Sequence, residues 1–355
     1  MHSQYDTRIF LKECQSLLQD GFQVNYVVPG VVNSINEGVH IYGVEKGGGH
    51  RLERMTKTVR AVYRKALEID ADLYHFHDPE LMPVGLILKK KGKKVIYDIH
   101  EDLPRALLSK RWINPFIRKP MACFFEIFEN YASRKFDFLM TATPFITERF
   151  KKVNPNTVNI NNYPLLGELQ SSSFKNIIFK QKQVCYVGGL GLIRGIHQLL
   201  FAADSIEGKI RIAGPINPIE MEEQLKTHSN IEYMGYLDRV EVKNLLGSSI
   251  AGIVTFLPEP NHINAQPNKM FEYMSAGIPV ICSDFPLWRS IIEKHDCGIC
   301  VDPENPEDIA KAINYLFANP QIAEQMGRNG RNAVETVFNW EQESEKLIEV
   351  YKKLI

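Results

Sequence analysis

The chain has 355 residues, which is more than one hydrophobic core usually supports and suits two domains of roughly 100–200 residues each. Apolar residues make up 44% of the chain and charged residues 24%, so the composition excludes a disordered protein. Lys plus Arg and Asp plus Glu both number 42, and this balance gives no reason to expect nucleic acid as a partner.

The sequence shows no sign of a membrane span or of secretion. No stretch reaches the roughly 18 apolar residues of a spanning helix, and no basic and apolar leader opens the chain. We therefore expect a cytoplasmic protein. Of six cysteines, only Cys297 and Cys300 are spaced as a pair. Because they lie where a turn enters an apolar run, we interpret them as structural thiols rather than as a metal or redox site.

The first half alternates short apolar runs with amphipathic helical segments. The segment 8–20 places four apolar side chains on one helical face, and Gly21 ends it. Apolar runs follow at 22–28, 39–44, 73–77, 95–99 and 138–143. This alternation predicts a doubly wound domain over residues 1–165, in which helices cover both faces of a parallel sheet. The opening residues resemble the loop after a strand, so we expect the first strand of this domain to be missing or replaced.

The second half repeats the pattern after an interruption. Residues 166–182 contain a Leu-Gly pair, a run of three serines and a lysine-rich end, and we interpret them as a linker. The apolar runs then return at 184–187, 210–213, 231–233, 250–257, 279–283 and 298–301. They predict a second doubly wound domain over residues 183–338. The final helix, 339–355, carries an apolar stripe that must pack against a domain.

The strongest candidate site follows the apolar run 250–257. Ligands of parallel sheets bind beyond the carboxyl ends of the strands, and the loop there leads into a helix that begins near Pro267 and ends at Gly277. Free backbone N–H groups at this helix start, with Lys269 in the first turn, would bind a diphosphate, and Glu272 would accept hydrogen bonds from ribose hydroxyls. On physical grounds alone, Lys269 and Glu272 as solvated surface residues remain the alternative.

A second candidate is the glycine-rich loop after 184–187, which contains Gly188, Gly189 and Arg194. Glycines let a backbone approach phosphate closely, and an arginine binds phosphate oxygens with a planar fork. The loop lacks the spacing and the acidic residue of a nicotinamide-binding fingerprint, so a dinucleotide is not indicated.

Polar side chains also follow two strands predicted for the first domain. His77 and Asp78 lie at the end of one apolar run, and His100 and Glu101 follow the next. We assign His77, Asp78 and Glu101 to the acceptor side of a cleft. His75 and His77 share a face, which leaves open a structural role, a ligand contact or a metal pair. Because the nearby carboxylates lack a metal-binding spacing, we predict no metal site.

Together these motifs resemble family 4 of the retaining glycosyltransferases, over almost the whole chain. The matching segments are Pro267-Asn268-Lys269 with 271–281, Tyr186-Val187-Gly188-Gly189 with Arg194-Gly195, 75–81, and 327–331 with 339–341. The resemblance implies the GT-B fold, in which two Rossmann-like domains face each other across a cleft. It also implies that the final helix, 339–355, packs back on the first domain.

The resemblance further implies a reaction and a set of site residues. The chain would move a sugar from a nucleotide diphosphate sugar to an acceptor with retention, needing no metal or other cofactor because cations and helix ends act on the leaving group. Arg194 and Lys269 would stabilise the diphosphate, Glu272 would hold the ribose, and His100 would contact the donor sugar. The implied donor-binding set is Gly188, Gly189, Arg194, Asn264, Lys269 and Glu272.

One position departs from the family pattern, which has two glutamates separated by seven residues. The first position here is Asn264, whose amide can bond a sugar hydroxyl but lacks the negative charge. Together with the missing strand, Asn264 keeps two alternatives open. One is a catalytically silent GT-B subunit that binds nucleotide or a partner, and the other is a sugar-nucleotide epimerase.

Residues 107–128 interleave basic residues, among them Lys110 and Lys119, with aromatic residues, among them Phe116 and Phe124. Such a segment can bind an anionic membrane surface, although a buried helix with solvated ends explains it equally well. Peripheral contact with the inner face of a membrane would suit a lipid-linked acceptor. Assembly of surface polysaccharide or glycolipid is the setting that the resemblance suggests.

Overall fold

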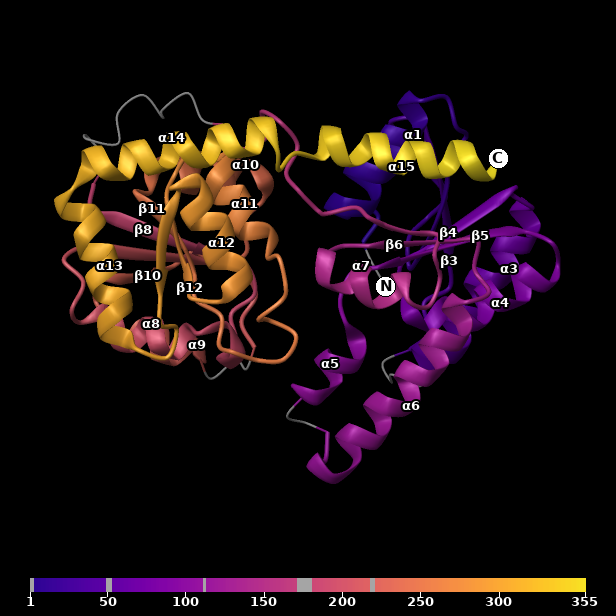
Figure 1. Ribbon diagram of the computed structural model, residues 1–355, viewed down its shortest axis with the longest axis horizontal. Coiled ribbons are helices and arrows are strands. Elements are labelled where there is room, and N and C mark those ends of the chain that lie inside the picture. The colour runs from indigo at the N-terminus through magenta and orange to yellow at the C-terminus, as the bar shows by residue number, and fades with distance from the viewer. Residues whose placement is uncertain (1–2, 49–52, 111–112, 171–180, 218–220) are drawn as a thin grey trace. The chain divides into compact units, whose positions relative to one another are not determined.

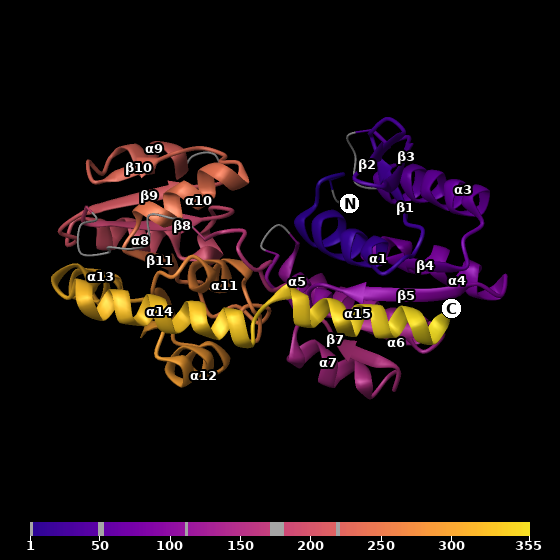
Figure 2. The same cartoon turned by 90° about the horizontal axis from the view of Figure 1, so that it is seen from above.

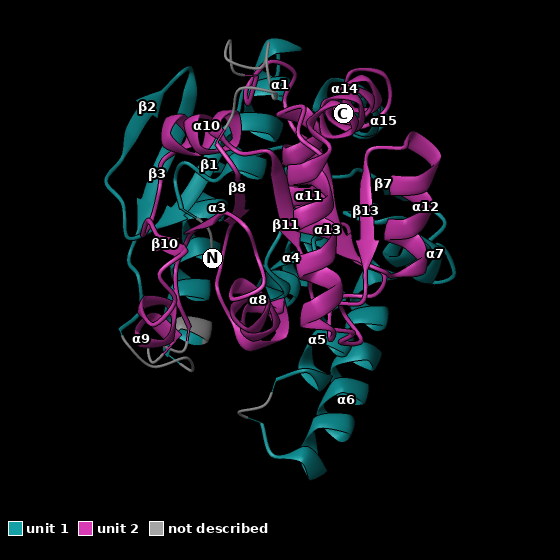
Figure 3. Cartoon of the chain, turned by 90° about the vertical axis from the view of Figure 1, so that its left-hand side faces the viewer, with its two compact units in different colours: residues 1–162, 340–355 teal, residues 163–339 magenta. Residues whose placement is uncertain are grey.

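The computed structural model describes residues 3–48, 53–110, 113–170, 181–217 and 221–355. The chain divides into two compact units, coloured separately in Figure 3. Unit 1 comprises Met1–Asn162 with Trp340–Ile355, and unit 2 comprises Tyr163–Asn339. Most of the predicted linker, 166–182, lies outside the described residues, but Leu169 is buried in the core of unit 2.

Unit 2 is built on a six-stranded parallel sheet with the order β10-β9-β8-β11-β12-β13 (Figure 1). The strands are β8 (Gln183–Val187), β9 (Lys209–Ala213), β10 (Ile231–Tyr233), β11 (Ala251–Val254), β12 (Val280–Ser283) and β13 (Gly298–Val301). Each falls on one of the six predicted apolar runs, because a strand covered on both faces needs nearly continuous apolar sequence. The prediction of a doubly wound sheet is confirmed here.

Helices pack on both faces of this sheet. They are α8 (Ile196–Ala203), α9 (Met221–Lys226), α10 (Arg239–Ser248), α11 (Asn268–Ser275), α12 (Pro286–His295), α13 (Pro306–Ala318) and α14 (Pro320–Thr336). Side chains of α8, α9 and α13 form one core with Tyr186, and side chains of α10, α11 and α12 form the other with Cys185. Tyr186 and Cys185 are consecutive in β8 and therefore point to opposite faces.

The strand order reverses between β8 and β11. From β8 the chain proceeds outward through β9 and β10, and it then returns to β11 on the other side of β8. Doubly wound sheets bind ligands at such a switch point, beyond the carboxyl ends of the strands. The loops after β8 and β11 are the two that the sequence analysis selected.

Unit 1 contains two separate sheets. The strands are β1 (Asn25–Pro29), β2 (Ser34–Asn36), β3 (Val39–Val44), β4 (Leu73–Phe76), β5 (Lys94–Ile99), β6 (Phe138–Thr141) and β7 (Thr157–Asn159). Strands β4 to β7 form a parallel sheet in chain order, as expected, but β1 and β3 pair apart from it, with β2 antiparallel to β3. The prediction of one parallel sheet is therefore wrong for this part. Glu37 (φ 47°) and Gly38 (φ 84°) form the left-handed pair of a two-residue hairpin between β2 and β3.

The helical segments of unit 1 cover these sheets. They are η1 (Thr7–Cys14), α1 (Gln15–Gln19), η2 (Arg54–Thr58), α3 (Val59–Ile69), η3 (Pro79–Leu81), α4 (Met82–Lys90), α5 (Leu103–Leu108), α6 (Pro115–Ser133), α7 (Pro144–Lys151) and α15 (Trp340–Leu354). In the described chain, loop residues lead into the π-helical η1, and the first strand is β1. Helix α15 packs along unit 1, where Leu347 and Val350 are buried and Trp340 Nε1 donates to Ser16 Oγ at 2.9 Å (Figure 2).

Helix α6 has one packed face and one exposed face. Its packed face contributes Ala122 and Phe125 to a small apolar cluster with α5. On the other face, Phe116 is 89%, Phe124 74% and Ile127 64% exposed. Phe124 and Ile127 lie inside the helix rather than at its ends, so the alternative of a buried helix with solvated ends is wrong. Among the described residues, no helix combines the length and the apolar character that crossing a bilayer requires.

Candidate functional site

The two loops at the switch point of unit 2 bring Arg194 and Lys269 together. Arg194 ends the 3₁₀ turn η6 (Leu192–Arg194) that follows β8, and Lys269 lies in the first turn of α11. Both cations approach the ring of Phe256, with Arg194 Cζ 4.9 Å and Lys269 Nζ 5.3 Å from its centroid. Two cationic groups from separate loops thus converge on one place.

Lys269 is buried, and its ammonium group forms no hydrogen bond within the described part of the chain. Its side chain is 7% exposed, and its Nζ lies 3.7 Å from the centroid of the Tyr186 ring. Burial and the neighbouring charge of Arg194 hold the pKa of Lys269 well below its usual value. A buried ammonium in this state is unfavourable, and an anionic ligand would relieve the cost.

Glycines make room for these cations. Gly188 has a φ of +122°, and a Cβ there would lie 2.9 Å from Lys269 Nζ. Gly195, with a φ of +72°, packs so closely that a Cβ would lie 1.8 Å from the carbonyl oxygen of Thr255. At Gly189 a Cβ would meet nothing within 4 Å, so this position borders open space. Any larger residue at Gly188 or Gly195 would displace the loop after β8.

The start of α11 lies directly beside the buried ammonium. Pro267 is its N-cap residue, and no side chain caps the helix, so its first backbone N–H groups receive no side-chain acceptor. The preceding loop is held in place by Trp288, whose Nε1 donates to the carbonyl of Ala265 at 2.7 Å. Asn264 is half-buried in this loop, next to that anchor. The bond to Trp288 therefore fixes the short segment that runs from Asn264 to Lys269 and includes the start of α11.

Glu272 lies one turn further along α11 and is 18% exposed. Its Oε1 accepts a hydrogen bond from Nη1 of Arg239 at 2.8 Å. Sequence spacing does not indicate this partner, because Arg239 starts another helix, 33 positions away.

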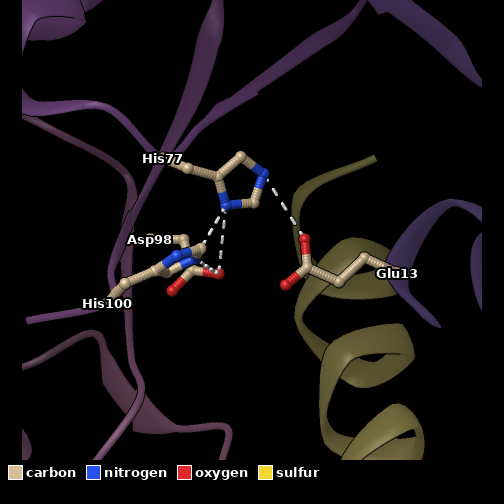
Figure 4. Close-up of side chains that lie close together, drawn as sticks. All are labelled: Glu13, His77, Asp98 and His100. Carbon is tan, nitrogen blue, oxygen red and sulfur yellow. Dashed lines mark hydrogen bonds and ion pairs between the residues drawn. The ribbon is translucent and has the colours of Figure 1, made fainter. Parts of the chain in front are cut away.

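In unit 1 the predicted histidines lie in a compact polar cluster with two carboxylates (Figure 4). His77 Nδ1 and His100 Nε2 are 3.0 Å apart, and Asp98 Oδ2 lies 3.4 Å from the first and 3.2 Å from the second. Glu13, from η1, has its Oε2 3.4 Å from His77 Nε2. His77 follows β4 and His100 follows β5, so the carboxyl ends of these paired strands bring the two histidines together.

Arg8 is the countercharge of this cluster. Its Nη2 lies 2.8 Å from Asp98 Oδ2, and its Nε lies 2.8 Å from Glu13 Oε1. Burial would raise the pKa of Asp98, but Arg8 and His100 hold it well below its usual value. Burial lowers the pKa of His100 to about 4, so its imidazole is neutral at neutral pH.

Glu13, His77, Asp98 and His100 each offer a potential metal ligand, and these atoms lie within 4.8 Å of one another. Sequence spacing could not indicate this group, because Glu13 comes from a distant helical segment. Both carboxylates, however, already accept hydrogen bonds from the guanidinium of Arg8. Arg8 therefore uses part of the acceptor capacity that the two carboxyl groups would offer a metal ion.

The two remaining residues of the predicted acceptor side lie at the same sheet edge. Asp78 is half-buried after β4, and its carbonyl accepts the N–H of Leu81, the last residue of η3. Glu101 follows His100 and is exposed. Sequence reasoning missed Arg8, Tyr186 and Phe256, which shape the two sites. A buried arginine and two apolar core positions carry no local signal of such a role.

Comparisons with known proteins agree with this geometry. Residues 8–160 match the family described as Glycosyltransferase Family 4, and residues 170–333 match Glycosyl transferases group 1. The uncharacterized glycosyltransferase MJ1607 of Methanocaldococcus jannaschii is 26% identical over 214 residues, which cover 57% of this chain and 53% of that protein. The O-antigen chain mannosyltransferase C of Escherichia coli is 25% identical over 305 residues, which cover 82% of this chain and 78% of that protein.

The fold also has a close counterpart among solved structures. The sucrose-phosphate synthase of Thermosynechococcus elongatus superposes with a TM-score of 0.81 at 18% identity, covering 98% of this chain and 92% of that one. At this level of identity the similarity concerns the fold alone. The predicted GT-B fold is confirmed.

Proposed function

The chain belongs to the family 4 glycosyltransferases, and we propose that it moves a sugar from a nucleotide diphosphate sugar to an acceptor with retention at the anomeric carbon. The observation that carries the proposal is the buried Lys269 ammonium, which has no hydrogen-bond partner among the described residues. Its position beside Arg194 and an uncapped helix start supports a site for a dianionic group. A diphosphate matches this charge and size.

In this proposal the diphosphate is the leaving group, and the protein stabilises the charge that develops on it. Lys269 and Arg194 supply positive charge, and the N–H groups at the start of α11 supply hydrogen bonds. Because these groups act where a metal ion acts in other sugar transferases, the proposed reaction needs no metal. The leaving phosphate accepts the proton of the acceptor hydroxyl as the new bond forms on the same face of the sugar.

The remaining residues receive roles around the diphosphate. Glu272 accepts hydrogen bonds from the ribose, and Gly188 and Gly189 let the backbone approach the phosphates. Asn264 contacts the sugar through its amide. His100 contacts the donor sugar as a neutral imidazole, in line with its pKa of about 4. His77, Asp78 and Glu101 are proposed to serve the acceptor.

The acceptor is proposed to be lipid-linked and to belong to surface polysaccharide or glycolipid assembly. The similarity to an O-antigen chain mannosyltransferase supports this setting. So does the exposed apolar face of α6, on which Phe116, Phe124, Ile127 and Tyr131 recur at helical spacing. Lys119 adds positive charge beside this face. We propose that the face lies on the anionic surface of a membrane.

The reaction is tested by incubating the protein with UDP-, GDP- and ADP-sugars, with and without lipid-linked acceptors, in chelator and in added Mg²⁺. Diphosphate release that requires an acceptor and continues in chelator supports the proposal, and the anomeric configuration of the product tests retention. An isomerised sugar without acceptor would identify an epimerase. Release in no condition, with nucleotide still bound, would favour the silent subunit that Asn264 keeps open.

The site is tested by Glu272→Ala and Lys269→Ala. We expect Glu272→Ala to weaken binding of the nucleoside diphosphate and Lys269→Ala chiefly to lower turnover, because Lys269 acts on charge that develops in the transition state. If calorimetry showed both variants binding the diphosphate as the parent does, the site would be wrongly assigned.

The membrane contact is tested with vesicles of anionic and of neutral phospholipid. Phe124→Ser with Ile127→Ser should lose binding to anionic vesicles, because the apolar face no longer inserts. Phe201→Ser is the matched control, since Phe201 is 69% exposed on α8 in unit 2. Equal binding by the double variant and the control would remove α6 from the proposal.

A further inference from the structure

Arg239 lies between two carboxylates of unit 2. Its Nη1 donates to Glu272 Oε1 at 2.8 Å, and its Nε donates to Glu168 Oε1 at 2.7 Å. The three side chains are largely shielded from solvent, with Arg239 36%, Glu168 20% and Glu272 18% exposed. A guanidinium in this position joins the helix that carries Lys269 to the segment that enters unit 2.

The backbone is anchored both beside Arg239 and beside its partner Glu168. Arg239 is the first residue of α10, directly after Asp238, which forms a capping box with Glu241. Asp238 Oδ1 accepts the N–H of Glu241 and Glu241 Oε2 accepts the N–H of Asp238, each at 2.8 Å. Next to Glu168, Leu169 is buried in the core. The bridge is therefore anchored at both ends.

The charges of this bridge do not cancel. Two carboxylates face one guanidinium, and Glu168 Oε2 is buried with no hydrogen-bond partner within the described part of the chain. Burial lowers the pKa of Arg239, but Glu272 and Glu168 together raise it above its usual value, so the guanidinium stays charged. A carboxylate has about four acceptor sites, and Arg239 occupies only part of the capacity of Glu272. Glu272 can hold Arg239 and still accept hydroxyl donors.

We propose that Arg239 is a positioning residue for donor recognition: it fixes the Glu272 carboxylate so that this group accepts both hydroxyls of the donor ribose. The proposal rests on the proposed function, in which Glu272 faces the ribose. A carboxylate held in one rotamer makes two directed hydrogen bonds to a vicinal diol, whereas a mobile one makes them only after losing side-chain freedom. The site then selects ribonucleotide donors over 2′-deoxyribonucleotide donors, which lack one of the two hydroxyls.

The experiment measures binding of UDP, GDP and ADP and of their 2′-deoxy counterparts by calorimetry. For the base that binds, we expect the parent to prefer the ribose form roughly tenfold, the worth of one directed hydrogen bond to a charged group. Arg239→Met keeps the aliphatic bulk and should lose most of that preference. In steady-state kinetics it should raise KM for the donor more than it lowers kcat.

Three further variants separate positioning from general damage. Arg239→Lys keeps the charge and should retain part of the preference. Glu168→Gln keeps the bond between Arg239 and Glu272 and should retain most of it, which covers the case that Arg239→Met does not fold. Arg211→Met is the matched control, because Arg211 pairs with Glu232 at 2.8 Å on β9 and should leave the preference unchanged.

Two results overturn the inference. One is an Arg239→Met variant that keeps the ribose preference of the parent. The other is an Arg239→Met variant that binds the diphosphate more tightly, because tighter binding means that Arg239 competes with the ribose for Glu272. These failures are distinct from failure of the proposed function. If Glu272→Ala binds diphosphate as the parent does, the proposed function fails, whereas weakened binding by Glu272→Ala beside unchanged binding by Arg239→Met removes only Arg239.

Discussion

Each unit has a buried cationic side chain, and the surroundings of the two side chains are opposite. In unit 1, the guanidinium of Arg8 lies 2.8 Å from carboxylate oxygens of both Asp98 and Glu13. In unit 2, the ammonium of Lys269 is equally buried, but among the described residues it has no hydrogen-bond partner. Removing one member of a buried ion pair leaves its partner unpaired and destabilises the folded unit, whereas a buried cation without a hydrogen-bond partner favours a ligand of opposite sign.

The candidate site residues of the two units also differ in how their side chains are held. His77 and His100 are held by partners that the fold supplies, so their orientation is set before any ligand arrives. Lys269 and Arg194 meet over the ring of Phe256, which contributes no formal charge. The first arrangement is suited to contacts with neutral hydroxyl groups, and the second to the charge of a phosphate.

The largest expected effect comes from breaking the compensation in unit 1. Arg8→Met leaves the Asp98 carboxylate buried without its countercharge and should destabilise unit 1 by about 3–5 kcal/mol. The free energy of unfolding of unit 1 is measured by hydrogen exchange of the β5 amides in increasing denaturant. As the control, Lys352→Met removes an exposed ion pair with Asp20 and should cost about 0–1 kcal/mol. Equal effects of the two variants would contradict the comparison.

The opposite result is expected in unit 2. Lys269→Met removes a buried ammonium that has no hydrogen-bond partner among the described residues and should raise the stability of unit 2 by about 1–3 kcal/mol. The same change should lower kcat by about 10²–10³, since it removes a group that stabilises the leaving diphosphate. Thermal unfolding and steady-state kinetics measure the two effects on one variant. Lys226→Met, which removes an exposed pair with Glu222, should change neither quantity appreciably.

Binding of a diphosphate beside Lys269 should be accompanied by uptake of protons. The lowered pKa of Lys269 means that part of its population is neutral at alkaline pH, below the unfolded value of 10.5. A bound diphosphate favours the charged form and raises this pKa, so binding should take up protons there. Calorimetry in buffers of different ionisation enthalpy measures the uptake, which Lys269→Met should abolish. Proton release by the parent would count against a diphosphate at Lys269.

A pH dependence of stability is expected from a carboxyl of unit 1 whose ion pair only partly offsets the cost of its burial. Glu129 accepts a hydrogen bond from Arg149 at 2.7 Å, yet burial raises its pKa from 4.5 to about 7. Its contribution to stability is complete below pH 4.5 and is lost as the pH rises through about 7. Relative to Glu129→Gln, the parent should therefore lose stability over this range. A difference between the two proteins that does not change with pH would contradict the shifted pKa.

Some features of both units could be predicted because they depend on local pattern. Nearly continuous apolar runs gave all six strands of the sheet in unit 2, since each is covered on both faces. Strands β2 and β7 were missed, because each has only three residues and includes polar ones such as Ser34 and Asn159. The separate pairing of β1 with β3 was missed for a different reason. Apolar periodicity indicates that a strand is buried and leaves its neighbour undetermined.

The sequence by itself determined the alternating architecture, the two loops at the switch point and the helix start that carries Lys269. Strand burial and helix boundaries depend on residues that are neighbours in the sequence. Only the tertiary structure decided which charges have partners. Arg8 meets Asp98 across 90 positions, and Arg239 meets Glu272 across 33. Local periodicity cannot indicate such distant pairs. That the ammonium of Lys269 lacks a hydrogen-bond partner among the described residues follows only from the positions of all its neighbours in the fold.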